Sequence, residues 1–175
     1  QQPRTVRVVA TTFTRGQLNA LSVELLSQGD ENAIGFSLQF DPNQLSYVSA
    51  ETGSGASNAL LIPNISQTAN GRLGIALALP AGERLAAGVR ALVTVRFNTA
   101  NTGSGNSTTV SFGDQPIRRQ IADVNANSLT ATFSEGALTL ANAVACVSAA
   151  SFTGERFASE SIVAAFGTNM ATATA

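Results

Sequence analysis

Large aliphatic or aromatic residues recur at every second position through much of this chain. Residues 73–79 read Leu-Gly-Ile-Ala-Leu-Ala-Leu, and residues 34–40 read Ile-Gly-Phe-Ser-Leu-Gln-Phe. A period of two places the large side chains on one face of a β-strand, whereas an amphipathic helix needs a period of about 3.6. These two segments therefore predict strands that bury one face.

Similar segments follow one another along most of the chain. We expect strands at 5–10, 18–26, 34–40, 45–50, 73–79, 89–97, 108–112, 128–133 and 137–140. Clusters of Gly, Pro, Asn and Asp separate several of them, for example at 29–32 and 41–43, and such clusters are typical of turns. Roughly nine strands at this spacing, with almost no helical period, predict an all-β sandwich.

Charge and composition argue against several functional classes. The 175 residues contain no His, and 10 Lys+Arg, all of them Arg, stand against 11 Asp+Glu. Balanced charge without basic clusters is unlike a nucleic-acid-binding surface. Without His there is no Ser-His-Asp arrangement, and no pair of acids stands out for glycoside hydrolysis, so we predict that the chain is not an enzyme. No apolar run approaches the roughly 20 residues that span a membrane, and without Lys, copies cannot be joined through Lys isopeptide bonds.

The beginning of the sequence indicates a secreted protein. It opens with Gln1-Gln2-Pro3, without Met, and it is rich in Thr, Ser, Ala, Asn and Gly. We interpret this as a mature N-terminus left after removal of a signal peptide. The expected location is therefore extracellular or at the cell surface.

The order of the strands resembles that of cohesin domains. The passage 36–48 contains Asp41-Pro42 and Leu45 between two strands, and 71–78, 88–97, 110–112 and 136–138 are similar to later cohesin strands in the same order. The resemblance covers about residues 4–141 and implies a jelly-roll β-sandwich of about nine strands, which we treat as a domain at 1–141. In cellulosomal cohesins, polar residues on the strand before this passage contact the dockerin. Those positions fall near Ala33 and Gly35, so the polar pair is missing here.

The C-terminal segment 142–175 does not resemble a cohesin and is similar to part of a different domain. Residues 147–152 and 162–169 resemble the opening of a C-terminal domain found in many secreted bacterial proteins. The segment includes Phe152, Ile162, Val163 and Phe166, which are too apolar for a solvated tail, and a lone pair of strands is marginally stable. We expect them to be buried against their own sandwich, inside a neighbouring subunit, or in the remainder of a truncated second domain.

These features favour an assembly module over a catalyst. The main hypothesis is an extracellular, pilus-like filament subunit that binds other copies of itself head-to-tail through a donated C-terminal strand. Phe152, Ile162, Val163 and Phe166 would be the inserted anchors. The alternative hypothesis is a monomeric extracellular module that recognises a polysaccharide or a dockerin-like protein.

Three side chains are candidates for covalent chemistry. Asn64 and Asn106 begin the glycosylation sequons Asn64-Ile-Ser and Asn106-Ser-Thr, both in expected loops. Cys146 is the only cysteine, so it forms either a bond between chains or a small buried apolar group.

Metal and sugar binding have weaker signals. Asp30, Glu31 and the acids of 114–123 are either ordinary turn residues or oxygen ligands for Ca²⁺, but no EF-hand spacing is present. We predict no metal and no other cofactor. Trp is absent and Tyr47 is the only tyrosine, so the chain offers little aromatic surface for stacking on sugar rings.

Overall fold

The computed structural model describes residues 3–101, 105–142, 145–148 and 163–166. The chain divides into two compact units, residues 1–140 and 141–175. In the first unit the described residues form strands, connecting loops and two short 3₁₀ turns, η1 (Ser54–Ala56) and η2 (Thr68–Asn70). No helix in the described part of the chain is long and apolar enough to cross a membrane.

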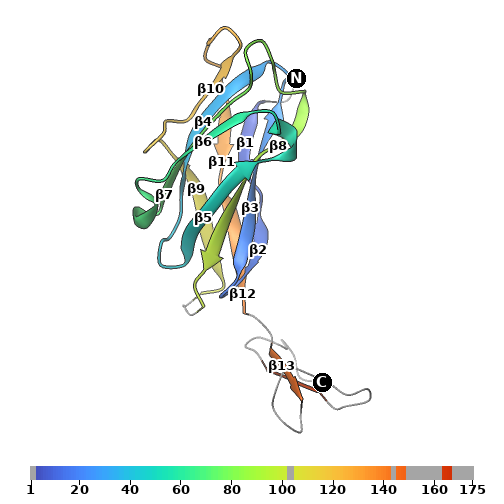
Figure 1. Cartoon of the computed structure of the whole chain (residues 1–175), viewed down its shortest axis with the longest axis vertical. Helices are drawn as coiled ribbons and strands as arrows, with labels where there is room; N and C mark the ends of the chain where they lie inside the picture. Colours follow the sequence, from blue (N-terminus) through green and yellow to red (C-terminus); the bar gives the residue numbers. More distant parts are fainter. Residues whose placement is uncertain (1–2, 102–104, 143–144, 149–162, 167–175) are drawn as a thin grey trace. The chain divides into compact units, whose positions relative to one another are not determined.

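One layer of the first unit is a five-stranded sheet. Its order is β11 (Thr132–Ser134), β1 (Thr5–Val8), β3 (Leu18–Ser27), β8 (Gly88–Thr99) and β5 (Leu45–Thr52). Figure 1 shows β3, β8 and β5 running side by side along the unit. Neighbouring strands are antiparallel except β1 and β11, which are parallel and place Thr5 opposite Thr132.

The other layer has seven strands. Its main path is β2 (Thr11–Thr14), β12 (Gly136–Ala141), β9 (Ser107–Gly113), β4 (Glu31–Gln39), β7 (Arg72–Ala78) and β6 (Leu60–Asn64). The seventh strand, β10 (Gln120–Asp123), also pairs with β4. β9 pairs with residues 37–39 of β4, and β10 pairs with residues 31–35. β9 and β10 therefore share one edge of β4 and are separated by the loop 114–119.

Two of the places where the chain passes from one layer to the other lie close together. β1 and β2 belong to different sheets, and so do β11 and β12. At the second crossing, a Cβ atom on Gly136 would lie 2.6 Å from Cγ1 of Val8. Such a distance is a steric clash, so the crossing requires glycine at this position.

The core lies between the two sheets and follows from the alternation in the sequence. In β4 the large residues Ile34, Phe36 and Leu38 are buried, and each alternate residue points to the other face. The principal buried side chains are Val6, Phe13, Leu21, Val23, Leu25, Phe36, Leu38, Leu73, Ile75, Leu92, Val95, Phe97, Val110 and Leu138. Phe40 packs edge-on against Phe97, with ring centroids 5.0 Å apart. The jelly-roll β-sandwich expected from the sequence is confirmed.

A buried ion pair joins the two sheets. Arg4, just before β1, donates from Nε to Oε1 of Glu31 at 2.5 Å and from Nη2 to Oδ1 of Asp30 at 2.6 Å. Glu31 opens β4, its side chain is 0% exposed, and Ser27 donates to its other oxygen. Burial alone would raise the pKa of Glu31, but the hydrogen bonds from Ser27, the Gln28 amide and Arg4 outweigh it and hold the pKa at about 2. Glu31 is therefore the ion-pair partner of Arg4. The sequence alone had left its role open between an ordinary turn residue and a metal ligand.

The strand boundaries differ from the expected ones in several regions. β2, β6 and β10 were not expected as separate strands, and the predicted strand 128–133 is observed only from Thr132 onward. Residues 128–131 instead follow the backbone of β10, where the Leu129 amide donates to the Ile121 carbonyl at 2.8 Å. Residues 128–131 therefore form an extended segment that pairs irregularly with β10.

The second unit contains two described strands. β13 (Ala145–Ser148) and β14 (Val163–Phe166) form an antiparallel two-stranded sheet, in which Cys146 is opposite Ala165. Val163 and Phe166 therefore lie at the two ends of one strand. Phe152 and Ile162 lie outside the described residues.

Candidate functional site

Part of the outer surface of the seven-stranded sheet is apolar and almost flat. Cα register places Ala122, Ala33, Ala78 and Leu60 in one row across β10, β4, β7 and β6. The next row across the same strands is Gln120, Gly35, Ala76 and Ile62. We call these eight residues, together with Ile117, the apolar face. They line a shallow depression of about 180 Å³.

The apolar face is formed by the residues that alternate with the core residues along each strand. Because Ile34 and Leu77 are directed into the core, the alternate positions on β4 and β7 face the outer side of the sheet. In the two rows these positions hold only Ala or Gly. On β6 the outward residues are large: Leu60 is 64% exposed and Ile62 is 54% exposed. Aliphatic side chains this exposed, next to a floor without charge, are typical of a surface that another molecule covers.

The loop 114–119 covers the adjoining part of the same sheet. The Ser37 hydroxyl donates to the Ile117 carbonyl at 2.7 Å, and the Ile117 amide donates back to the Ser37 oxygen at 2.8 Å. A Cβ atom on Gly74 would lie 2.8 Å from Cγ1 of Ile117, and one on Gly35 would lie 3.3 Å from its Cγ2. The two glycines therefore make room for an isoleucine supplied by the chain itself.

An ion pair holds the two ends of this loop. Arg119 donates from Nε to Oδ1 of Asp114 at 3.0 Å and from Nη2 to Oδ2 at 2.8 Å. These hydrogen bonds lower the pKa of Asp114. The Arg119 guanidinium also lies 5.7 Å from the centre of the Phe133 ring, within the range of a cation–π contact. The position of Ile117 is therefore fixed from both sides.

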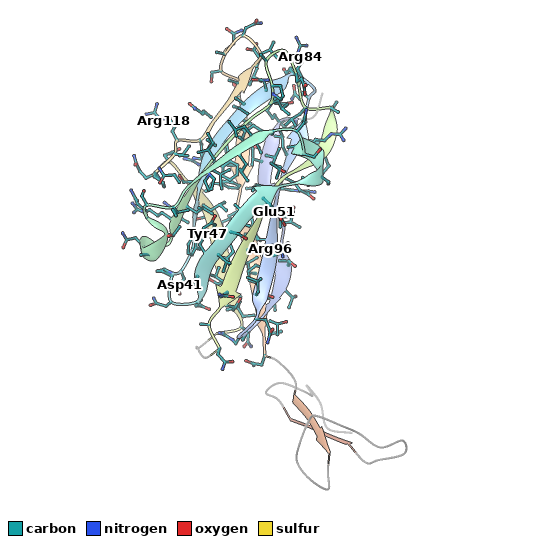
Figure 2. The ribbon with its side chains drawn as sticks, in the orientation of Figure 1. Asp41, Tyr47, Glu51, Arg84, Arg96 and Arg118 are labelled. Carbon is teal, nitrogen blue, oxygen red and sulfur yellow. The ribbon has the colours of Figure 1, made fainter. Side chains whose placement is uncertain are left out.

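Charged side chains border the apolar face but do not enter it. Arg118 is exposed next to Ile117, and Figure 2 shows its side chain projecting from the margin of the unit, with Arg84 at another margin. Glu83 accepts a hydrogen bond from Asn58, just before β6. The only polar residue on the face itself is Gln120.

The free edge beside the face is closed to a further strand. β6 pairs with β7 and is the last strand of the main path of its sheet in the described structure. Its residue Pro63 has no amide hydrogen, and proline on an edge strand prevents regular pairing with another chain. The β6 edge is therefore unsuited to regular extension of the sheet by a further strand.

The outer surface of the five-stranded sheet carries charged pairs, which the apolar face lacks. Arg7 on β1 pairs with Glu24 on β3 at 2.8 Å, and Arg96 on β8 pairs with Glu51 on β5 at 2.7 Å. Figure 2 shows Glu51 and Arg96 next to each other over these strands. The remaining outward positions of β3 include Ser22, opposite Thr94. The same sheet also exposes Leu18 on β3 and Val89 on β8, so charged pairs lie beside exposed aliphatic side chains on this surface.

The arrangement of the two sheets is shared with solved structures of cohesins. A non-cellulosomal cohesin from Archaeoglobus fulgidus has a TM-score of 0.65 and 16% identity, covering 79% of this chain and 91% of its own. The sixth cohesin of Acetivibrio cellulolyticus scaffoldin B, solved with a Cel5 dockerin mutant, has a TM-score of 0.69 and 18% identity, covering 79% of this chain and 99% of its own. The sandwich has a cohesin-like fold.

A third similar structure extends the comparison. A type I cohesin–dockerin complex from Clostridium thermocellum has a TM-score of 0.68 and 12% identity, covering 79% of this chain and 99% of that one. No protein-family model matches the sequence, and no curated protein matches it. The cohesin-like resemblance seen in the sequence is thus confirmed at the level of the fold.

Two positions that the sequence analysis singled out lie at the centre of the apolar face. Ala33 and Gly35, where the resemblance expected a polar pair, are the β4 residues of the two rows. Sequence reasoning did not identify Leu60, Ile62, Ala76, Ala78 or Ile117 as part of the same surface. The signal available for β6 was the exposed alternation of Leu60 and Ile62 just before Pro63, but the pairing of β6 with β7 had to be known as well.

The predicted glycosylation sites lie away from the centre of this face, and the candidate metal-binding acids form hydrogen bonds within the protein. Asn64 ends β6 and Asn106 immediately precedes β9, so both sequons border strands and neither lies wholly within a loop. Asp123 accepts hydrogen bonds from the amides of Asn125 and Asn127, which lower its pKa, as does the Asn127 side chain. Among the described residues, no three His, Cys, Asp or Glu side chains gather as a metal site.

Proposed function

We propose that this chain is a non-catalytic extracellular module that binds another protein on its apolar face. The observation that carries the proposal is the face itself: its two rows consist of Ala, Gly and Gln120 without any charge, and they end in the exposed Leu60 and Ile62. The centre of a protein interface is depleted in charged residues and gains its free energy from buried apolar area. The dockerin complexes among the similar cohesins support a protein as the occupant.

The chemistry of the face describes the partner. Ala33, Gly35 and Ala76 offer no side-chain hydrogen bonds, so recognition depends on shape and on apolar contact. The partner presents aliphatic side chains that fill the depression between Ile117 and Ile62. A partner that relies on hydrogen bonds to a polar pair on β4 would leave its own polar groups unsatisfied here, which costs about 1–3 kcal/mol per group.

A matched pair of variants tests the proposal. The full chain, Ala76→Arg on the apolar face and Ser22→Arg on the opposite surface are immobilised and exposed to purified dockerins and to the culture supernatant of the producing cells. We expect a protein that the full chain and Ser22→Arg retain and Ala76→Arg loses. Equal retention by all three proteins would contradict the proposal.

A second candidate function is assembly with other copies of the chain. The segment 162–166 reads Ile-Val-Ala-Ala-Phe and has no charge, which matches the uncharged floor of the apolar face. In this case the occupant is the C-terminal segment of another copy, with Phe152, Ile162, Val163 and Phe166 as its anchors. Because Pro63 closes the β6 edge, such a segment would lie across the face.

Negative-stain electron microscopy separates the two candidates. Filaments formed by the full chain and lost in both Phe166→Asp and Ala76→Arg would favour self-assembly through the apolar face. Loss in Phe166→Asp alone would place the acceptor elsewhere on the chain. Monodisperse particles from all three proteins would leave a different protein as the occupant.

A further inference from the structure

The two glycosylation sequons have different structural surroundings. Asn64 is the last residue of β6, and its sequon continues into the exposed residues Ile65 and Ser66. Asn106 directly precedes β9, and its sequon continues into that strand. An enzyme that transfers a glycan must reach the asparagine amide and the hydroxyl residue together. The two sites therefore differ in accessibility.

The Asn64 sequon is open and locally ordered. The Ser66 hydroxyl donates to Oδ1 of Asn64 at 2.7 Å, and the Ser66 amide donates to the same oxygen at 3.2 Å. Both bonds use the amide oxygen, and no hydrogen bond within the described residues uses Nδ2. The nitrogen that would carry a glycan is therefore unengaged, and the hydroxyl residue lies beside it at the surface.

The Asn106 sequon is partly incorporated in the sheet. Thr108 is only 8% exposed and lies opposite Leu138 in the pairing of β9 with β12. The Asn106 carbonyl also accepts a hydrogen bond from the Leu140 amide at 2.8 Å. Access to the Thr108 hydroxyl requires β9 to separate from β12, and such local opening costs free energy.

We propose that Asn64 is the acceptor of an N-linked glycan and that Asn106 is not modified in the folded chain. The co-reactant is an oligosaccharide linked to a lipid through a diphosphate. Nδ2 forms a bond to C1 of the first sugar, the bond between C1 and the phosphate oxygen breaks, and the lipid diphosphate leaves with the electron pair. Nδ2 loses one proton to solvent.

The glycan would stand at the border of the apolar face. Asn64 is opposite Gly74 on β7, one row beyond Ile62 and Ala76. Its side chain is on the same outward side of β6 as Leu60 and Ile62, because these residues alternate along the strand. A bulky, hydrated group at this position shields the β6 end of the face. This consequence for partner binding rests on the proposed function, whereas the acceptor site itself does not.

The acceptor can be tested on the folded chain. The full chain is incubated with a purified oligosaccharyltransferase and a lipid-linked oligosaccharide, then digested with trypsin and analysed by mass spectrometry. Cleavage after arginine separates the two sequons into the peptides 16–72 and 97–118. We expect the glycan mass on 16–72, with at least about tenfold less on 97–118, which corresponds to about 1.4 kcal/mol of local opening.

Two variants and a reversed order of steps provide the controls. Asn64→Gln and Ser66→Ala should abolish the modification of 16–72, whereas Asn106→Gln should leave it unchanged. Digestion before glycan transfer should allow both peptides to be modified, because the strand pairing is then lost. Absence of the glycan from 16–72 in the folded chain, or equal modification of 97–118, would overturn the proposal.

Shielding of the face can be measured without a partner protein. Anilinonaphthalene sulfonate fluoresces when it binds exposed apolar surface, so the part of the signal that Ala76→Arg removes reports on the apolar face. We expect lower fluorescence from the glycosylated chain than from the unmodified chain, and a loss of most of the signal in Ala76→Arg. Equal fluorescence with and without the glycan would overturn the shielding but not the acceptor site or the proposed function.

Discussion

The outer surfaces of the two sheets differ although both are built from the same alternation. On the five-stranded sheet the outward positions include Arg7, Glu24, Glu51 and Arg96, which pair across strands. On the seven-stranded sheet between β10 and β6, the outward positions of the two rows are Ala, Gly, exposed aliphatic residues and the uncharged Gln120. The core requires large residues at only every second position, so each outer surface is free to be suited to water or to a partner. The contrast between the two is therefore a functional signal.

The largest effect is expected below both surfaces, where Arg4 meets Glu31. Replacing Arg4 with Met leaves the Glu31 carboxylate buried without its cation, and we expect a loss of about 3–5 kcal/mol in the free energy of unfolding. Urea unfolding measures it. The double variant Arg4→Met, Glu31→Leu should recover most of the loss, because the pair is replaced by apolar groups. A loss below about 1 kcal/mol in Arg4→Met would show that the pair does not hold the sheets together.

Acid should weaken the same connection. The pKa of Glu31 is about 2 in the folded state against an ordinary value of 4.5, so its contribution is complete above pH 4.5 and is lost as the pH falls through about 2. The difference corresponds to about 3 kcal/mol. Urea unfolding between pH 6 and pH 2 should show this loss in the unmodified chain. Glu31→Gln, whose side chain does not titrate, should show a smaller loss.

An intermediate effect is expected where the loop covers the sheet. Gly74→Val adds a side chain where Ile117 already lies, with the new Cβ 2.8 Å from Cγ1 of Ile117. We expect a destabilisation of about 1–3 kcal/mol, typical of overpacking, and faster hydrogen exchange at the Ile117 amide. The double variant Gly74→Val, Ile117→Ala should regain stability. Additive effects would show that Gly74 and Ile117 do not share this space.

A small effect is expected on the charged surface. Arg7→Met removes an exposed pair with Glu24, which is worth about 0.2–1 kcal/mol. High salt should reduce the difference between the variant and the unmodified chain, because salt screens exposed charges. The same substitution at Arg4 provides the comparison. Equal losses at Arg4 and Arg7 would contradict the difference in burial between the two pairs.

The smallest effect on stability is expected at the apolar face. Leu60 is 64% exposed, so Leu60→Asp should change the free energy of unfolding by less than about 0.5 kcal/mol. The same change should reduce binding of the dye anilinonaphthalene sulfonate and retention on a hydrophobic column. A large destabilisation would mean that Leu60 serves the core and would remove it from the candidate interface.

The sequence predicted the fold better than the site. The alternation around Phe36 and Ile75 identified the core strands, because a strand that buries one face has large apolar residues at every second position. The apolar face depends on which strands are neighbours, so Ile62, Ala76 and Gly35 are a single surface only once β6, β7 and β4 are paired. Ile117 was also missed, since its position depends on a hydrogen bond to Ser37 across 80 residues.

The acids at 30–31 illustrate the same limit in another way. A turn with Asp30 and Glu31 has the composition of an exposed loop or of a cation site. Its actual role is set by Arg4, which lies far enough away in the sequence that no local pattern connects them. The sequence therefore predicts which face of a strand is buried, but it does not predict which distant residue a polar side chain contacts.

The parallel pairing of β1 with β11 has a mechanical consequence. β1 begins the sandwich and β11 lies near its end, and three residue pairs, from Thr5 with Thr132 to Arg7 with Ser134, connect them. Tension that pulls Thr5 and Ser134 apart acts along both strands in opposite directions. The hydrogen bonds between these strands are then loaded together in shear and do not open one after another. The pairing is thus suited to resist a pulling force between β1 and β11.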